Sequence, residues 1–290
     1  MILFKNSNDL RKHLSLQRSK GLNAGFVPTM GALHKGHVSL IHRSKTDSRF
    51  TVCSVFINPT QFNDQDDFEK YPVTIKEDIL ALESAGCEVL FLPSVKEIYP
   101  KGVGELASYD LGHLEEVLEG RYRPGHFQGV CNVMDRLLRI IAPANVYLGQ
   151  KDYQQCLVIE RMMKLTGLNK VTNLHTVPTL RENDGLAMSS RNLRLNENER
   201  KLAPAIFREL KKVQEVINPG RLGQLKSEAA QSLDRKGFKV DYFEIADNNL
   251  RLLDEWDGKQ EIVVLVAAYL NEVRLIDNII IKERAGLTKT

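Results

Sequence analysis

Apolar strand-like runs alternate with helical patterns from the start of the chain to about residue 177. Residues 50–57 are apolar and rich in β-branched side chains, as in a strand that is buried on both faces. Ile75, Ile79 and Leu82 share one helical face before Gly86, which ends the helix. The other predicted strands are the run entering the turn at Gly31 and residues 87–93, 146–149 and 170–177, and the other predicted helices are residues 10–17, 38–43, 130–141 and 152–165. This alternation predicts an α/β domain with a parallel sheet covered on both faces.

The pattern changes after Arg181. A polar, loop-like stretch (181–194) precedes two helical patterns, in which Pro204 either kinks the first helix or marks its start. Three strand-like runs follow, at residues 238–245, 262–268 and 273–281. Helices followed by adjacent strands predict a smaller α+β domain, so we expect one domain over residues 1–183 and another over 184–290.

Residues 94–129 are rich in Gly and Pro and show no clear period. The stretch carries Arg121, Arg123 and His126, and it is long for a structureless connection. We expect it to cover a site or to contain short elements that the pattern does not reveal.

Composition excludes several classes of protein. The 290 residues carry a net charge of +3, which does not call for a nucleic-acid partner. The four cysteines are far apart, without metal-ligand pairing or a compact disulfide framework, and reduced thiols suit a cytoplasmic protein. The N-terminal residues turn polar too early for a signal peptide, and the longest apolar run (262–270) is too short to span a bilayer. We therefore expect no membrane partner.

The main candidate site is the turn that follows the first predicted parallel strand. It delivers His34 and His37, three residues apart, to the start of a helix, where positions i and i+3 lie on one face. Free backbone N–H groups and the positive end of the helix dipole lie there too, and Gly36 adds no side chain. The spacing predicts a phosphate site, with two histidines on a partly exposed helix start as the alternative.

A second candidate is the loop segment Met188-Ser189-Ser190-Arg191. Two hydroxyls and a guanidinium bind phosphate oxygens well, although an isolated segment of this kind is more often a solvated hinge. Lys151-Asp152 supplies a positive charge and a helix cap at the end of another predicted strand, where sites of parallel sheets collect. A surface lysine beside a capping Asp is the alternative.

Other polar residues are weaker candidates. The amides of Gln61 and Gln155 both donate and accept, which suits a substrate with hydroxyl and carboxylate groups, whereas either residue alone is by default a surface or structural one. Glu77-Asp78 offers oxygen ligands for magnesium, and a solvated charged face is the alternative. Arg121 and Arg123 either clamp an anion or are exposed loop charges.

Taken together, these segments resemble the pantoate–β-alanine ligase (pantothenate synthetase) family over nearly the whole chain. The matching motifs are Pro28-Thr29-Met30-Gly31-Ala32-Leu33-His34-Lys35-Gly36-His37, Asn58-Pro59-Thr60-Gln61-Phe62, Arg123-Pro124-Gly125-His126-Phe127, Gly149-Gln150-Lys151-Asp152-Tyr153-Gln154-Gln155, Asp184-Gly185-Leu186-Ala187-Met188-Ser189-Ser190-Arg191-Asn192, Asp241-Tyr242-Phe243-Glu244 and Arg274-Leu275-Ile276-Asp277-Asn278. Two positions depart from the family pattern: Thr60 stands where methionine is common, and Leu180 where valine is common.

The resemblance implies a fold, an activity and a set of site residues. The fold is a Rossmann-like nucleotidyltransferase domain with a smaller C-terminal domain, in a cytoplasmic homodimer. The implied reaction is the ATP- and Mg²⁺-dependent condensation of (R)-pantoate with β-alanine through pantoyl adenylate, releasing AMP and pyrophosphate, in the pathway to coenzyme A. The implied ATP-binding residues are Met30, Gly31, Ala32, Leu33, His34, Lys35, Gly36, His37, Gly149, Gln150, Lys151, Asp152, Leu180, Met188, Ser189, Ser190 and Arg191.

Within that set, the expected catalytic groups are His37, His34, Lys151, Ser189, Ser190 and Arg191, with His37 in the position usually described as the proton donor. Gln61, Gln155 and Arg123 are the expected substrate-binding residues, and Glu77 and Asp78 the expected metal ligands. Two rivals stay open. One is a nucleotidyltransferase that joins AMP permanently to its substrate, and the other is an RNA-binding module derived from a synthetase fold. The lack of a basic, aromatic-studded face argues against the second.

Overall fold

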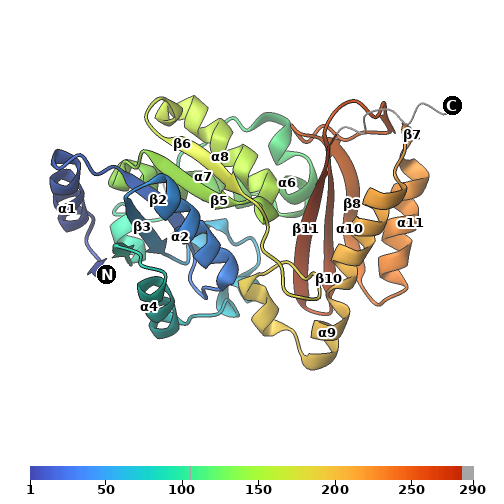
Figure 1. Ribbon diagram of the computed structural model, residues 1–290, viewed down its shortest axis with the longest axis horizontal. Helices are drawn as coiled ribbons and strands as arrows, with labels where there is room; N and C mark the ends of the chain where they lie inside the picture. Colours follow the sequence, from blue (N-terminus) through green and yellow to red (C-terminus); the bar gives the residue numbers. More distant parts are fainter. Residues whose placement is uncertain (105, 283–290) are drawn as a thin grey trace. The chain divides into compact units, whose positions relative to one another are not determined.

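The computed structural model describes residues 1–104 and 106–282, which fall into two compact units, Met1–Leu180 and Arg181–Thr290. We describe each unit by itself (Figure 1). The division lies close to the domain boundary expected from the sequence at residues 183 and 184.

The first unit is built on a parallel sheet, which confirms the predicted α/β class. Its strands, in spatial order, are β1 (Ile2–Phe4), β4 (Val89–Phe91), β3 (Phe50–Val55), β2 (Ala24–Thr29), β5 (Asn145–Gly149) and β6 (Asn173–Val177). Every neighbouring pair is parallel. The sequence pattern did not predict β1, because this strand has three residues and two of them, Ile2 and Leu3, are exposed.

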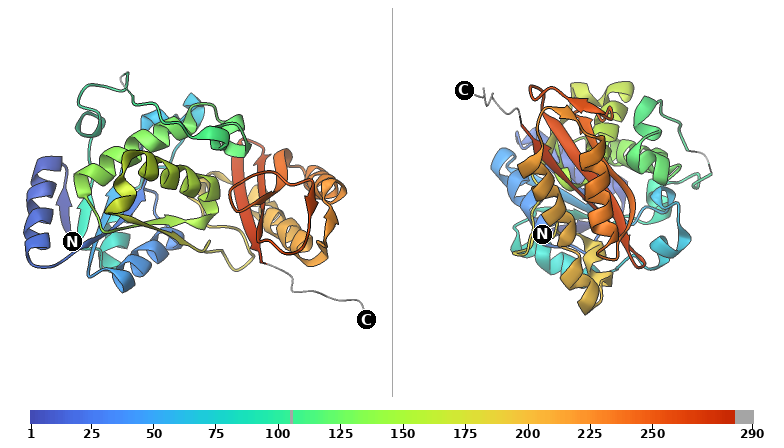
Figure 2. Two further views of the ribbon diagram at one scale, coloured as in Figure 1. Left: turned by 90° about the horizontal axis from the view of Figure 1, so that it is seen from above. Right: turned by 90° about the vertical axis from the view of Figure 1, so that its right-hand side faces the viewer.

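Helices cover both faces of this sheet, as predicted. The main helices are α1 (Ser7–Ser19), α2 (Lys35–Asp47), α4 (Ile75–Ser84), α7 (His126–Ile141) and α8 (Tyr153–Thr166). Val27, Cys53 and Leu90 pack with residues of α2 and α4 in one apolar cluster. Side chains alternate along a strand, so the buried Phe26 and Val52 face the other side. There α7 contacts α1 and α8, and Figure 2 shows α7 and α2 on opposite sides of the sheet.

The stretch before α7 contains several short elements. They are α5 (Val95–Ile98), the 3₁₀ turn η2 (Gly112–Glu115) and α6 (Leu118–Tyr122). The buried amide of Gln154 joins η2 and α6 to α8: it donates to the carbonyls of Leu114 and Val117 and accepts the N–H of Glu119. The other short elements of this unit are η1 (Pro59–Gln61), α3 (Gln65–Glu69), η3 (Gln150–Asp152) and η4 (Leu168–Lys170).

The second unit is α+β, as predicted. An antiparallel sheet has the order β11 (Val273–Ile281), β10 (Ile262–Leu270), β8 (Lys239–Asp247), and a small pair joins β7 (Gly220–Arg221) to β9 (Glu255–Trp256). The other elements are η5 (Ser190–Arg194), α9 (Glu197–Leu202), α10 (Ala205–Val216) and α11 (Gly223–Asp234). Leu210 of α10 and Leu233 of α11 share a core with Val264 of β10. Pro204 is the residue before α10, with a φ of −62°, so it marks a helix start rather than a kink.

Arg181 anchors the first residues of the second unit. Its guanidinium donates two hydrogen bonds to the buried carboxylate of Asp277, at 2.6 and 3.0 Å, and two more to the carbonyls of Gly185 and Asn278. It also lies over the Phe207 ring, 3.8 Å from the centroid. These contacts join residue 181 to β11 and α10, which explains why the division between units comes directly before it.

Within the described part of the chain, no helix is both long and apolar enough to cross a membrane.

Candidate active site

The candidate site of the first unit lies where the strand order reverses, between β2 and β5. β2 pairs with β3 along six residues but with β5 only at Gly25 and Phe26. The carboxyl ends of β2 and β5 therefore no longer pair, and each leads into a turn rich in candidate residues. Ligands of open parallel sheets bind at such a switch point, which agrees with the position expected from the sequence.

The turn after β2 is held by a carboxylate from another element. Gly31 and Ala32 both have positive φ, of 84° and 48°. The side chain of Asp78, 2% exposed on α4, accepts the N–H groups of Ala32 and Leu33 at 3.0 and 2.7 Å. Successive N–H groups of a turn can form an anion-binding concavity, and here the anion is Asp78 itself.

This role bears on the metal prediction. The Asp78 carboxylate also accepts the hydroxyl of Thr74, so three donors occupy its oxygens, while Glu77 is exposed. Neighbouring helical residues point in different directions. Glu77 and Asp78 therefore do not fit one magnesium ion, and no group of three or more His, Cys, Asp or Glu residues suited to a metal occurs in ranges 1–104 and 106–282.

His34 and His37 lie together, with ring centroids 4.0 Å apart, which confirms the proximity predicted from their spacing. His34 caps α2: its Nδ1 accepts the N–H of Gly36 at 3.1 Å. In return, Nδ1 of His37 accepts the N–H of His34 at 3.3 Å. Because each Nδ1 is an acceptor, each neutral ring carries its proton on Nε2. Both imidazoles are thus hydrogen-bond donors in a fixed tautomer.

Both rings stay neutral because they are half-buried and lie beside positive charge. Burial lowers the pKa of His34 from 6.5 to about 2, with smaller contributions from His37 and Lys151. Burial also lowers the pKa of His37 to about 4, and Lys151 adds to this effect. The Lys151 ammonium thus disfavours a positive charge on both rings.

Lys151 and Asp152 occupy the 3₁₀ turn after β5. The Lys151 Nζ lies 3.2 Å from Asp152 Oδ1, and the Lys151 side chain is 16% exposed. Asp152 stands at the cap position of α8 as expected, but its side chain makes no capping hydrogen bond. The carboxylate pairs with Lys151 instead, so its main local role is electrostatic.

Gln61 lies at the end of η1, and its amide is oriented by Asn58. Asn58 Nδ2 donates to Gln61 Oε1 at 3.1 Å and to the Gly129 carbonyl at 3.2 Å, while Asn58 Oδ1 accepts the N–H of Thr60 at 3.3 Å. Gln61 Nε2 lies 2.9 Å from Met30 Sδ. The donating end of Gln61 therefore lies beside Met30, the first residue of the turn that carries the two histidines (residues 30–37, the histidine turn).

Two residues that support this region, Asn58 and His126, have no assigned role in the sequence analysis. Asn58 marks only the end of a strand there, although an Asn before Pro commonly caps a short turn. His126 Nδ1 donates to the Gln61 carbonyl at 2.6 Å, and its Nε2 lies 3.3 Å from Arg123 Nη1. Arg123 also donates to Asn63 Oδ1 at 3.2 Å, so it belongs to the surroundings of Gln61.

The remaining candidates of this unit are more exposed to solvent. Gln155 is half-buried on α8, Lys35 is exposed, and Leu180, the last residue of the first unit, is 40% exposed. Arg121 is exposed on α6.

In the second unit, residues 188–191 form an ordered turn into η5. Met188 and Ser190 are buried, and the Ser189 hydroxyl accepts the N–H of Arg191 at 3.4 Å. Asn192 donates to the Ala187 carbonyl at 3.0 Å, which closes the turn.

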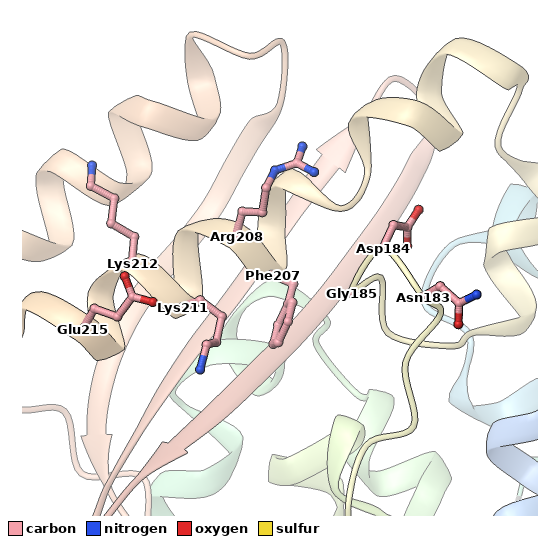
Figure 3. Close-up of a pocket in the computed structure, with 8 residues that line it drawn as sticks. All are labelled: Asn183, Asp184, Gly185, Phe207, Arg208, Lys211, Lys212 and Glu215. Carbon is pink, nitrogen blue, oxygen red and sulfur yellow. The ribbon is translucent and has the colours of Figure 1, made fainter.

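An open hollow of about 350 Å³ lies in the same unit, between the turn at Asp184 and α10 (Figure 3). Its lining includes none of the candidate site residues and consists of Asn183, Asp184, Gly185, Phe207, Arg208, Lys211, Lys212 and Glu215. Gly185 and the Phe207 ring are already in tight contact there, so the aromatic face is occupied by the protein itself.

Comparison with known proteins gives the family of this chain. Residues 2–280 match the family model described as pantoate-beta-alanine ligase. The pantothenate synthetase of Porphyromonas gingivalis is 42% identical over 283 residues, covering 96% of this chain and 99% of that protein. The corresponding protein of Cytophaga hutchinsonii is 40% identical over 285 residues, covering 97% and 99%.

Solved structures give the same result. Pantothenate synthetase from Thermus thermophilus has a TM-score of 0.84 at 38% identity, covering 96% of this chain and 99% of that one. Pantoate-beta-alanine ligase from Francisella tularensis, complexed with beta-gamma ATP and beta-alanine, has a TM-score of 0.81 at 35% identity, covering 96% and 97%. The chain belongs to the pantoate–β-alanine ligase family.

Proposed function

We propose that this chain condenses (R)-pantoate with β-alanine at the expense of ATP, through pantoyl adenylate, and releases AMP and pyrophosphate. The observation that carries the proposal is the match of residues 2–280 to the pantoate-beta-alanine ligase family. One contact in the site supports it: Gln61 Nε2 lies 2.9 Å from Met30 Sδ. It places an amide donor, suited to a carboxylate or hydroxyl oxygen, at the start of the turn that holds two imidazole donors. A thioether sulfur is a weak acceptor, so a substrate oxygen would bind this donor more strongly.

The first step joins pantoate to the α-phosphate. A carboxylate oxygen of pantoate attacks the α-phosphorus, the bond from that phosphorus to the pyrophosphate oxygen breaks, and pyrophosphate leaves. Negative charge builds on the phosphate oxygens as this happens. The Nε2–H groups of His34 and His37 and the ammonium of Lys151 stabilise that charge, and they need no rearrangement because backbone bonds already hold both rings. As neutral donors with low pKa values, the rings supply hydrogen bonds rather than protons.

The second step forms the amide. The amine of β-alanine attacks the acyl carbon of the adenylate, the bond to the bridging oxygen breaks, and AMP leaves with that oxygen. The attacking nitrogen loses a proton to solvent or to the departing phosphate. Gln61, which fixes the carboxyl end of pantoate, keeps the acyl carbon in place for this attack.

Magnesium is expected with the nucleotide, since triphosphates bind it through their own oxygens. Glu77 and Asp78 do not fit a shared ion, so the phosphate oxygens of the nucleotide would hold the metal. The assignments of Gln155 and Arg123 to substrate, and of Leu180 and residues 188–191 to the nucleotide, stay predictions from the resemblance. The homodimer and the cytoplasmic location are also predictions from the sequence.

The test mixes the protein with ATP, Mg²⁺ and pantoate, with and without β-alanine, and follows pyrophosphate and AMP. We expect pantoate-dependent pyrophosphate in both mixtures and free AMP only when β-alanine is present. A compound that keeps the AMP group permanently would favour the nucleotidyltransferase alternative, and retention of tRNA on a filter would favour the RNA-binding one.

Lys151→Ala tests whether the Lys151 ammonium stabilises the negative charge on the phosphates in the first step. We expect the formation of pantoyl adenylate to slow by about 10² or more, the usual effect of removing one preorganised electrostatic group. Lys164→Ala is the matched control, because Lys164 pairs with Glu160 on the exposed face of α8. Adenylate formation at the parental rate in Lys151→Ala would contradict the assignment.

A further inference from the structure

Backbone groups fix the orientation of the Asn58 amide, which is 1% exposed. The Thr60 N–H is always a donor and the Gly129 carbonyl always an acceptor. Asn58 must therefore turn its oxygen toward Thr60 and its NH₂ toward Gly129, and this NH₂ also meets Gln61 Oε1. With Oε1 directed at Asn58, the NH₂ end of Gln61 points toward Met30 and is the end presented to a ligand there. The orientation of the Gln61 amide is thus decided by Asn58, the N-cap residue of η1.

Two hydroxyl groups reinforce this orientation. The phenol of Tyr99 donates to Asn58 Oδ1 at 2.8 Å, and Thr60 Oγ1 lies 3.0 Å from the same oxygen and 3.2 Å from the phenol. These distances are shorter than the 3.3 Å from the Thr60 N–H. The hydroxyls are therefore the closest donors to the oxygen whose position decides how Gln61 is turned.

Tyr99 is itself firmly held. It lies at the end of α5 and is 2% exposed, and the guanidinium of Arg136 lies over its ring, 5.0 Å from the centroid. Burial raises the pKa of Tyr99, so the phenol keeps its proton and remains a donor. Thr60 supplies the second hydroxyl at a position where the family commonly has methionine, which has none.

We propose that Tyr99 and Thr60 are positioning residues that lock the Asn58 amide and thereby turn the NH₂ end of Gln61 toward the carboxylate of the hydroxy acid. This inference rests on the proposed function and deepens it. If Asn58 turned over, Gln61 would turn with it and present Oε1 to a negatively charged carboxylate. The two hydroxyls therefore favour substrates with an acceptor oxygen at this point, without touching the substrate themselves.

Kinetics test the proposal, because it predicts a change in the KM for pantoate without a change in the KM for ATP. Tyr99→Phe removes one hydroxyl with no change of shape, and we expect the KM for pantoate to rise roughly fivefold, the effect of one hydrogen bond. Tyr99→Phe with Thr60→Val should raise it further, whereas Tyr99→Phe with Thr60→Ser keeps the second hydroxyl and should resemble Tyr99→Phe alone. The KM for ATP should stay at the parental value throughout, which a general loss of structure would not allow.

Matched controls remove buried hydroxyls elsewhere in the same unit. The Tyr147 hydroxyl lies 3.3 Å from Ser48 Oγ, and Thr172 donates to the Pro143 carbonyl at 2.7 Å. These partners place both hydroxyls outside the Asn58 network. Tyr147→Phe with Thr172→Val should leave the KM for pantoate unchanged. An equal rise in this control, or no rise in the double variant at Tyr99 and Thr60, would overturn the proposal.

Side-chain amide exchange tests the lock without using activity. In the free protein, the Asn58 NH₂ protons, assigned from the signal lost in Asn58→Asp, should exchange slowly with solvent. They should exchange at least about tenfold faster in the Tyr99 and Thr60 double variant than in the control. Unchanged exchange contradicts the lock even in an active enzyme. If exchange is faster in the double variant but the protein does not use pantoate, the fixing of the Asn58 amide by Tyr99 and Thr60 is supported, and the proposed function is contradicted instead.

Discussion

His34 and His37 each accept a backbone N–H at Nδ1, and this arrangement decides what the two rings offer to a phosphate. A capping histidine and its partner three residues on satisfy two of the free N–H groups at the start of α2. The same bonds leave both Nε2–H groups as donors. The histidine spacing thus serves helix capping and ligand binding at once.

The low pKa of His37 predicts a dependence of stability on pH. In the unfolded chain His37 takes up a proton near pH 6.5, but in the folded protein only near pH 4. Its contribution to stability is therefore complete above about 6.5 and is lost as the pH falls toward about 4. We expect the urea midpoint of the parent to fall over this window more steeply than that of His37→Gln, because Gln keeps the capping box without titrating. Equal slopes would contradict the burial of a neutral imidazole.

Asp78 gives a second prediction at the scale of a residue. Asp78→Ala leaves the buried N–H groups of Ala32 and Leu33 without their acceptor, at about 1–3 kcal/mol for each such group. We expect a lower thermal midpoint and slower pyrophosphate release. The Mg²⁺ concentration that gives half-maximal release should not change, because the carboxylate holds the turn. A shift in that concentration with unchanged stability would instead identify Asp78 as a metal ligand.

At the scale of elements, α7 packs at Gly129 against the backbone of η1, the turn that carries Gln61. A Cβ at Gly129 would lie 2.0 Å from the Thr60 carbonyl oxygen and 2.7 Å from Gln61 Cα, so α7 and η1 approach too closely for any other residue. The carbonyl of Gly129 also accepts from Asn58. One helix position therefore controls both the spacing and the hydrogen bonding of the amide network.

Gly129→Ala should accordingly push η1 and α7 apart. We expect a loss of stability of about 1–3 kcal/mol or more from overpacking, together with a higher KM for pantoate. Gly223→Ala, at the start of α11, is the matched control, because no atom lies within 4 Å of the added Cβ. Thermal unfolding and the two KM values measure the effect. A Gly129→Ala protein as stable as the control would show that the contact is not tight.

Hydrophobic periodicity predicted most of the elements well, because β3 and β10 are buried runs and β11 is buried or half-buried throughout. The helices α4 and α7 carry apolar residues at helical spacing. The periodicity failed for β1, which is short and half exposed, and for η2 and α6. The latter are held by the side chain of Gln154, whose bonds to backbone groups leave no trace in a hydrophobic pattern.

At the scale of the whole molecule, the parts of the site differ in how far sequence alone accounts for them. The histidine turn and the Lys151 turn follow two strands of one parallel sheet, so their meeting at the switch point could be predicted from topology. Asp78 and Tyr99 could not be assigned in this way. The hydrogen bond between Asp78 and Ala32 joins residues 46 positions apart in the sequence, and that between Tyr99 and Asn58 joins residues 41 positions apart. Both contacts depend on the packing of complete elements.

The central claim is that the pantoate carboxylate attacks the α-phosphate of ATP. Pantoate labelled with ¹⁸O in both carboxyl oxygens tests it most directly, in a reaction with ATP, Mg²⁺ and β-alanine followed by mass spectrometry of the products. We predict that AMP carries one labelled oxygen, derived from the bridging atom of pantoyl adenylate, and that the amide product keeps the other. Unlabelled AMP, or ADP with the label in inorganic phosphate, would contradict the proposed function.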